Sequence, residues 1–183
     1  MPHLISTRHL PHLAIAASVT LFAASPALAG ADRIEARGEL VRYDDRLPEG
    51  AGARVQAVSP PTGDTLVTLR VWGLEPNTEY GAHAHVNPCG ATGAAAGPHF
   101  QHVPNPRPEL HPTNPEYANP VNEVWLDLTT NSAGRAVVRT TQPWQFSPGG
   151  GARSVIIHEE HTHTGPLDSG LAGARLGCLD VDF

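Results

Sequence analysis

The chain has 183 residues, and 18 acidic side chains against 12 arginines, with no lysine, give a formal net charge of −6 at pH 7. An acidic balance without a basic cluster argues against a nucleic-acid partner, because nucleic-acid binding needs a concentrated positive patch. It does not argue against a small anionic substrate, since the local field near a cleft matters more than the net charge.

The first 29 residues have the pattern of a secretory signal peptide. Arg8 precedes an apolar run over residues 13–23, and Ala27 and Ala29 form a small-residue cleavage site before Gly30. Such a run is too short and wrongly flanked for a stable membrane span. We therefore expect a secreted, envelope or periplasmic protein with no membrane span after cleavage. Residues 30–183 are enough for one domain with a sizeable core.

Short alternating runs dominate the rest of the chain. In residues 65–72, Val67, Leu69 and Val71 fall on one face of a strand, whereas Thr68 and Arg70 fall on the other. Similar runs cover residues 33–43, 53–58, 79–86, 124–130, 135–141, 152–158 and 176–181. No stretch of about 12 residues has a helical period. Eight short strands separated by turns predict an all-β, antiparallel sandwich or barrel.

Two segments lack strand patterns and predict long loops. Residues 98–120 hold seven prolines, and residues 159–174 carry His161, His163 and Asp168. Long irregular segments in a compact domain are usually functional or disordered. One loop begins at His99 and the other follows His158, so we expect the two loops to form the walls of one site.

The only cysteines are Cys89 and Cys178. An isolated pair in an exported chain predicts one disulfide, with two free buried thiols as the alternative. The bond would close a loop of about 90 residues, which the chain-entropy model values at roughly 4–5 kcal/mol.

Histidines supply the chemical signal. His83 and His85 lie two positions apart in a predicted strand and therefore point to the same face. Imidazole is a ligand for copper, zinc, iron and nickel, and a tetragonal all-nitrogen site suits Cu(II) best. A His-x-His pair alone is weak evidence, because a hydrogen-bonded structural role is the commoner use of any one histidine.

Four segments together are specific: residues 81–85, 97–100, 157–159 and 172–178. In order and chemistry they resemble the Cu,Zn superoxide dismutase family, over about residues 34–183. The resemblance implies an eight-stranded antiparallel Greek-key β-sandwich or barrel, with two long loops forming the metal site. It also implies that His83, His85, His99 and His158 bind copper.

The resemblance further implies that the protein converts superoxide to oxygen and hydrogen peroxide. His99 would release reduced copper, take up a proton and return it. Arg175 would guide the anion, because a guanidinium is always charged and offers several donors. The alternative for Arg175 is an ordinary solvated arginine at the start of a strand.

At the positions of the family's zinc site, this sequence departs from the family's pattern. The family uses two further histidines and an aspartate after the bridging histidine. Here only His102 and His111 are candidates, and no aspartate lies between His99 and Asp127. A structural zinc ion needs four good ligands, so we expect copper without a complete zinc site. Glu123, or Asp127 in its place, would orient His99 instead, unless Glu123 is an ordinary acid at a strand edge.

The sequence therefore predicts an exported copper enzyme that dismutes superoxide. The alternative is a non-enzymatic copper-binding or copper-delivery protein on the same fold, and a sandwich without metal comes third. His161 and His163 would be an accessory copper-capture site or, more simply, solvated loop histidines. The sequence makes no prediction of the oligomeric state.

Overall fold

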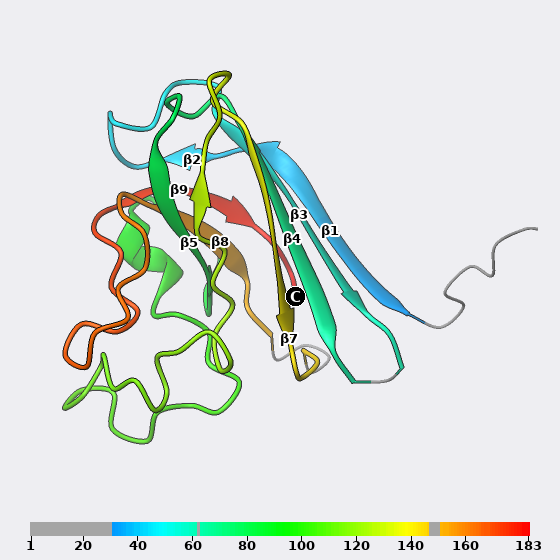
Figure 1. Cartoon of the computed structure of the whole chain (residues 1–183), viewed down its shortest axis with the longest axis vertical. Helices are drawn as coiled ribbons and strands as arrows, with labels where there is room; N and C mark the ends of the chain where they lie inside the picture. Colours follow the sequence, from blue (N-terminus) through cyan, green and yellow to red (C-terminus); the bar gives the residue numbers. More distant parts are fainter. Residues whose placement is uncertain (1–30, 62, 147–150) are drawn as a thin grey trace, which may run out of the picture.

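The computed structural model describes residues 31–61, 63–146 and 151–183, so the expected signal peptide lies outside the described residues. Two antiparallel sheets pack face to face (Figure 1). The four-stranded sheet has the order β1-β3-β4-β7, and the five-stranded sheet has the order β2-β9-β8-β5-β6. Within the described ranges, no helix has the length and apolar character that crossing a membrane requires. The all-β sandwich predicted from the sequence is confirmed.

The strand bounds follow the alternating runs. The four-stranded sheet contains β1 (Asp32–Glu39), β3 (Gly52–Ser59), β4 (Thr65–Trp72) and β7 (Ala136–Gln142). The five-stranded sheet contains β2 (Val41–Arg42), β5 (Glu79–His85), β6 (Leu128–Thr129), β8 (Ser154–His158) and β9 (Arg175–Asp180). One 3-10 helix, η1 (Gly93–Ala96), follows β5.

The connections give a Greek key. Strand β5 pairs with β6, and β6 contacts β7 of the other sheet. Strand β8 then returns to pair with β5, so the fourth strand of the set lies beside the first. The core fills the space between the sheets, where side chains such as Val55, Leu69 and Ile157 are fully buried.

Two predicted strands differ from the structure. The run over residues 33–43 divides at the buried Leu40, and its two parts enter different sheets as β1 and β2. The run over residues 124–130 forms only the two-residue β6, with an isolated bridge from Trp125 to His83. Residues 122–126 are all buried, so this segment is covered on both sides and does not alternate as a surface strand does. The described residues thus form nine strands, where eight were expected.

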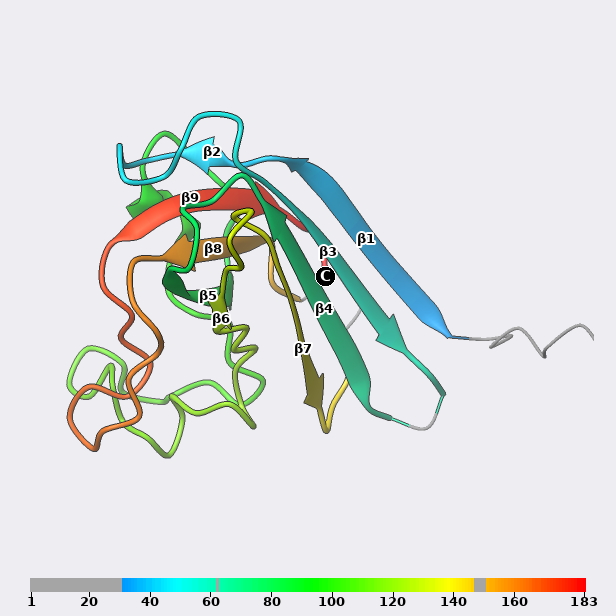
Figure 2. The same ribbon diagram turned by 45° about the horizontal axis from the view of Figure 1, so that its top comes forward.

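Strand β5 is buried on both of its faces. Ala82 and Ala84 pack into the core between the sheets. His83 and His85 point to the opposite face and have no exposed surface. Figure 2 shows the two long loops gathered on the side of the molecule away from β1, β3 and β4. These loops cover the histidine face of β5.

The disulfide between Cys89 and Cys178 is confirmed, and their Cα atoms lie 5.8 Å apart. Cys178 is a fully buried residue of β9 and pairs with Ile156 of β8. Cys89 belongs to the segment that follows β5. The bond therefore links the segment that follows β5, the strand of His83 and His85, to β9, the strand that begins at Arg175.

Replacing both cysteines by alanine should lower the free energy of unfolding by about 4–5 kcal/mol, because the unfolded chain regains the entropy of a loop of about 90 residues. Urea denaturation of the metal-free protein measures this loss. Adding a reductant should bring the wild-type midpoint down to that of the variant. A loss below about 1 kcal/mol would contradict the assignment of a stabilising role to this bond.

Candidate metal centre

Four histidines converge beneath the two long loops. One ring nitrogen from each of His83, His85, His99 and His158 lies within 4.8 Å of the corresponding atom of the other three. His83 and His85 come from β5, His158 ends β8, and His99 forms a bridge to His85. Across the part of the chain that the structure describes, this is the single cluster of three or more potential metal ligands.

Hydrogen bonds at the outer ring nitrogens determine which nitrogen faces the cluster. His85 donates from Nδ1 to the backbone oxygen of Gly97, 3.0 Å away. His99 Nδ1 lies 2.8 Å from the Glu123 carboxylate. In both rings the Nε2 atom is therefore left for a metal ion. His158 Nε2 lies 3.4 Å from His85 Nε2, so it faces the same point.

His83 has the opposite arrangement. The Thr162 hydroxyl lies 2.5 Å from the Asp127 carboxylate and 2.6 Å from His83 Nε2. An ionised carboxylate only accepts hydrogen bonds, so the hydroxyl proton goes to Asp127. The hydroxyl oxygen then accepts the Nε2 proton of His83, and the lone pair of His83 lies on Nδ1. That Nδ1 atom is buried and has no hydrogen-bond partner.

The cluster fits a metal ion that prefers imidazole ligands. A buried nitrogen without a partner is costly unless something occupies its lone pair, and a metal ion at the centre would do so. Opposite ligands at bond lengths of about 2.0–2.1 Å lie at most about 4.2 Å apart. The widest separation, 4.8 Å, would therefore shorten by roughly half an ångström on binding.

Burial keeps these imidazoles neutral. It lowers the pKa values of His83 and His85 well below the ordinary histidine value, and the neighbouring His99 adds to the effect. Burial likewise lowers the pKa of His158 to about 3. Metal ligation requires the neutral ring, so these three side chains are ready to bind at neutral pH without first losing a proton.

Glu123 is placed where it can orient His99. The glutamate is 1% exposed. Besides facing His99 Nδ1, its carboxylate accepts hydrogen bonds from Trp125 Nε1 and Gln101 Nε2, each at 2.8 Å. The structure thus brings Glu123 to the outer nitrogen of His99, as expected from the sequence. Its effect on metal binding stays a prediction.

Asp127 acts on a different ligand. It accepts hydrogen bonds from the Thr162 backbone N–H and hydroxyl, and Thr162 in turn contacts His83. Asp127 therefore supports His83 rather than His99. Sequence reasoning missed Thr162, because a single threonine between two loop histidines has no periodic or spacing signal.

Arg175 lies beside the cluster without an acidic partner. It pairs with His158 in the β8–β9 register, and its Nη1 donates to the backbone oxygen of Gly93 at 2.7 Å. No ion pair between described residues involves Arg175. Burial lowers its pKa, but an arginine remains charged at neutral pH.

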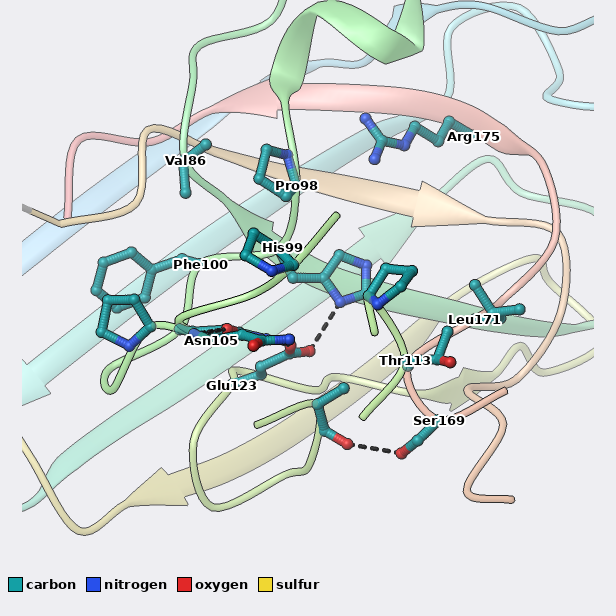
Figure 3. A pocket seen from close by; sticks show the side chains of 16 residues that line it. Val86, Pro98, His99, Phe100, Asn105, Thr113, Glu123, Ser169, Leu171 and Arg175 are labelled. Carbon is teal, nitrogen blue, oxygen red and sulfur yellow. Dashed lines mark hydrogen bonds and ion pairs between the residues drawn. The ribbon is translucent and has the colours of Figure 1, made fainter. Parts of the chain in front are cut away.

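A pocket of about 490 Å³ adjoins His99, Glu123 and Arg175 (Figure 3). Residues of both long loops line it, including Pro104 and Pro112 from the first loop and Leu171 from the second. The two loops therefore wall one hollow beside the histidine cluster, as their positions in the sequence predicted.

The remaining loop histidines lie outside the cluster. His102 stacks on Trp144 with ring centroids 4.8 Å apart, and His111 is an exposed residue of the proline-rich loop. The Nε2 atom of His161 contacts the backbone oxygen of Leu128. His163 lies between the carboxylates of Glu160 and Asp168, at 3.2 Å and 3.0 Å. Neither the zinc candidates nor the accessory pair converges with the other ligands.

No family model matches the chain, and no curated protein matches it. Among solved structures, the crystal structure of the clock protein EA4 is similar, with a TM-score of 0.54 and 20% sequence identity. The match covers 82% of this chain and 92% of that chain. At this level of identity the likeness concerns the fold alone.

The metal-free protein should lose stability as the pH falls from about 6.5 to about 5. The unfolded chain takes up protons in this range, whereas His158, with a folded pKa of about 3, stays neutral, and His83 and His85 shift in the same direction. Stability therefore falls by up to about 1.4 kcal/mol per pH unit for each such histidine. Urea midpoints measure this slope. His111→Gln should not change the slope, and a flat profile would contradict the buried neutral rings.

Glu123→Gln should weaken metal binding by about 10–100-fold, as expected when the partner of a ligand imidazole is lost. A glutamine offers one acceptor oxygen where His99, Trp125 and Gln101 now share two. Competition titration against a chelator measures the affinity. Glu116→Gln, which changes an exposed acid of the proline-rich loop, is the matched control and should have no effect. Equal affinities for wild type and Glu123→Gln would exclude the orienting role.

Proposed function

We propose that this protein is an exported copper enzyme that dismutes superoxide, as the resemblance of its four sequence segments suggests. The observation that carries the proposal is the position of Arg175, an arginine without an acidic partner, beside the convergent histidines and their pocket. The chain as a whole is acidic, so a half-buried positive charge at this position requires a reason. Attraction of a small anion to the metal supplies one.

Copper is the metal that the donor set favours. All four convergent atoms are imidazole nitrogens, without thiolate or carboxylate, and such a set in a tetragonal arrangement suits Cu(II). Bound copper would supply reversible one-electron transfer, taking an electron from one superoxide ion and giving it to another. The chain's own residues would supply the attraction of the anion and one of the protons.

Among the four histidines, His99 is the one best placed to carry a proton. Its side chain is 16% exposed, whereas His83, His85 and His158 are buried. Glu123 holds Nδ1, so the ring would keep its direction whether Nε2 binds a metal ion or carries a proton. A proton carried on Nε2 would pass to the reduced oxygen species, and solvent in the pocket would replace it.

We further propose that the protein uses copper without a complete zinc site. Glu123 engages His99 Nδ1 directly, and that atom is the one a second metal would need. Metal analysis of the purified protein tests this point. One zinc ion per copper ion, lost on mutation of His102 and His111, would overturn it.

The decisive experiment uses the purified, copper-loaded chain that begins at Gly30. We expect one copper ion per chain and dismutation of superoxide, measured by pulse radiolysis. His158→Ala should lose both, whereas His111→Ala should lose neither. Copper binding without dismutation would favour the non-enzymatic copper-binding or copper-delivery protein. Absence of copper binding would leave a sandwich without a metal function.

Arg175→Ala should lower the dismutation rate by about tenfold or more with copper content unchanged, because electrostatic steering typically contributes 10–10³ in association rate. The remaining rate should also depend less on ionic strength. Arg107→Ala, which removes a charge from the exposed part of the proline-rich loop, is the control. If both variants lose activity equally, the effect is one of net charge and Arg175 has no special role.

A further inference from the structure

The outer face of the four-stranded sheet carries a row of arginines. Arg37 of β1, Arg54 of β3 and Arg70 of β4 are Cα partners in the strand register. Neighbouring strands lie about 4.7–4.9 Å apart, so the three side chains stand next to one another. Arg135, just before β7, lines one hollow of about 520 Å³ together with Arg37 and Arg70. These four residues are called the arginine face below.

Most of this positive charge has no acidic partner. Glu35 pairs with Arg54 at 2.7 Å, and Arg33 lies 4.0 Å from the same carboxylate. Within the described ranges, no ion pair involves Arg37, Arg70 or Arg135. The chain has a net charge of −6, so the arginine face has the opposite sign to the molecule as a whole.

The neighbouring arginines of this row repel one another in the folded protein. Like charges directly opposite one another on neighbouring strands destabilise a sheet. Even so, side chains at the edge of the hollow are packed in fixed positions. A Cβ atom at Gly52 would lie 2.3 Å from the Trp72 indole, so the ring lies close against the backbone of β3 there. Arg37 in turn lies over this indole, 5.3 Å from its centroid. Trp72 thus holds Arg37 at the rim of the hollow.

We propose that the arginine face binds a linear acidic polysaccharide laid across the strands. Guanidinium groups bind planar or tetrahedral oxyanions through paired hydrogen bonds, which suits carboxylate and sulfate groups equally. Arg37, Arg54 and Arg70 form a single line across three strands, so the row fits a single extended polymer.

The spacing of the row favours a glycan over other anionic chains. The interval of about 4.8 Å is close to the length of one sugar ring along an extended polysaccharide, whereas same-face side chains of an extended peptide repeat at about 6.6–6.8 Å. A single-stranded nucleic acid is disfavoured because its binding sites combine positive charge with aromatic rings on which the bases stack. The aromatic ring that lines this hollow, Trp72, is covered by Arg37.

This site is independent of the metal centre. His83 and His85 point away from the core on the outer side of the five-stranded sheet, and the arginine face lies on the outer side of the other sheet. Figure 2 shows β1, β3 and β4 on the opposite side of the molecule from the two long loops. Polymer binding would therefore leave the pocket beside His99 open.

The test uses the full exported chain in its metal-free form, so it does not depend on copper or on dismutation. Immobilised polygalacturonate supplies carboxylates, immobilised dextran sulfate supplies sulfates, and neutral dextran is the blank. We expect retention at low salt on at least one acidic matrix and none on dextran, and the matrix that retains the protein identifies the acidic group. Arg37→Gln with Arg70→Gln should elute at clearly lower salt. Arg107→Gln with Arg153→Gln, which removes the same charge elsewhere, should elute as wild type does.

Three results would overturn the proposal. They are passage of the wild type through both acidic matrices at low salt, an equal loss of retention in the two double variants, and tighter binding to a single-stranded oligonucleotide than to either polysaccharide. Arg70→Gln alone gives an independent readout by urea denaturation. Relief of like-charge contact should leave its midpoint equal to or above that of wild type, and a lower midpoint would mean that Arg70 serves the fold instead.

Discussion

The four-histidine cluster depends on one strand that is buried on both of its faces. In β5, the two-residue alternation sends Ala82 and Ala84 into the core and His83 and His85 to the other side. The second side must then be covered, and the two long loops cover it. Gly81 permits this cover, because a Cβ there would lie 2.5 Å from the backbone oxygen of Glu160. The close approach brings the second loop, and with it Thr162, onto the strand.

Burying imidazoles in this way requires partners for their outer nitrogens. Glu123 and Gly97 supply them for His99 and His85, and Thr162 with Asp127 supplies them for His83. A buried polar network is stabilising only when its members are satisfied. Two members are left without a hydrogen-bond partner: the inward-facing Nδ1 of His83 and the outer Nδ1 of His158. Hydrogen bonds therefore fix the direction of three of the four rings, and they leave the nitrogens that face the centre free for a metal ion.

The sequence predicted what periodicity and spacing encode. Alternation placed the strands, and the isolated cysteine pair predicted the disulfide. Alternation overestimated the strand over residues 124–130, where only Leu128 and Thr129 pair in sequence with β5 and Trp125 forms an isolated bridge to His83. It also missed the division at Leu40, because a chain that crosses between sheets keeps its pattern while changing its partners. Thr162 and Arg54 lay beyond prediction for a different reason, since their roles depend on neighbours that are distant in the chain.

The order of strands in the sheet has a consequence for how the protein matures. His85 and His158 are 73 residues apart in the chain, and β8 pairs with β5 only after the intervening β6 and β7 have been made. Pairings of such long range form slowly, since loop entropy must be lost before the contacts form. In small zinc domains metal binding and folding occur together, because the unfolded chain holds no preformed site. Here the four histidines come together only once β8 has paired with β5, so a metal ion could meet its complete set of ligands only after this sheet has formed.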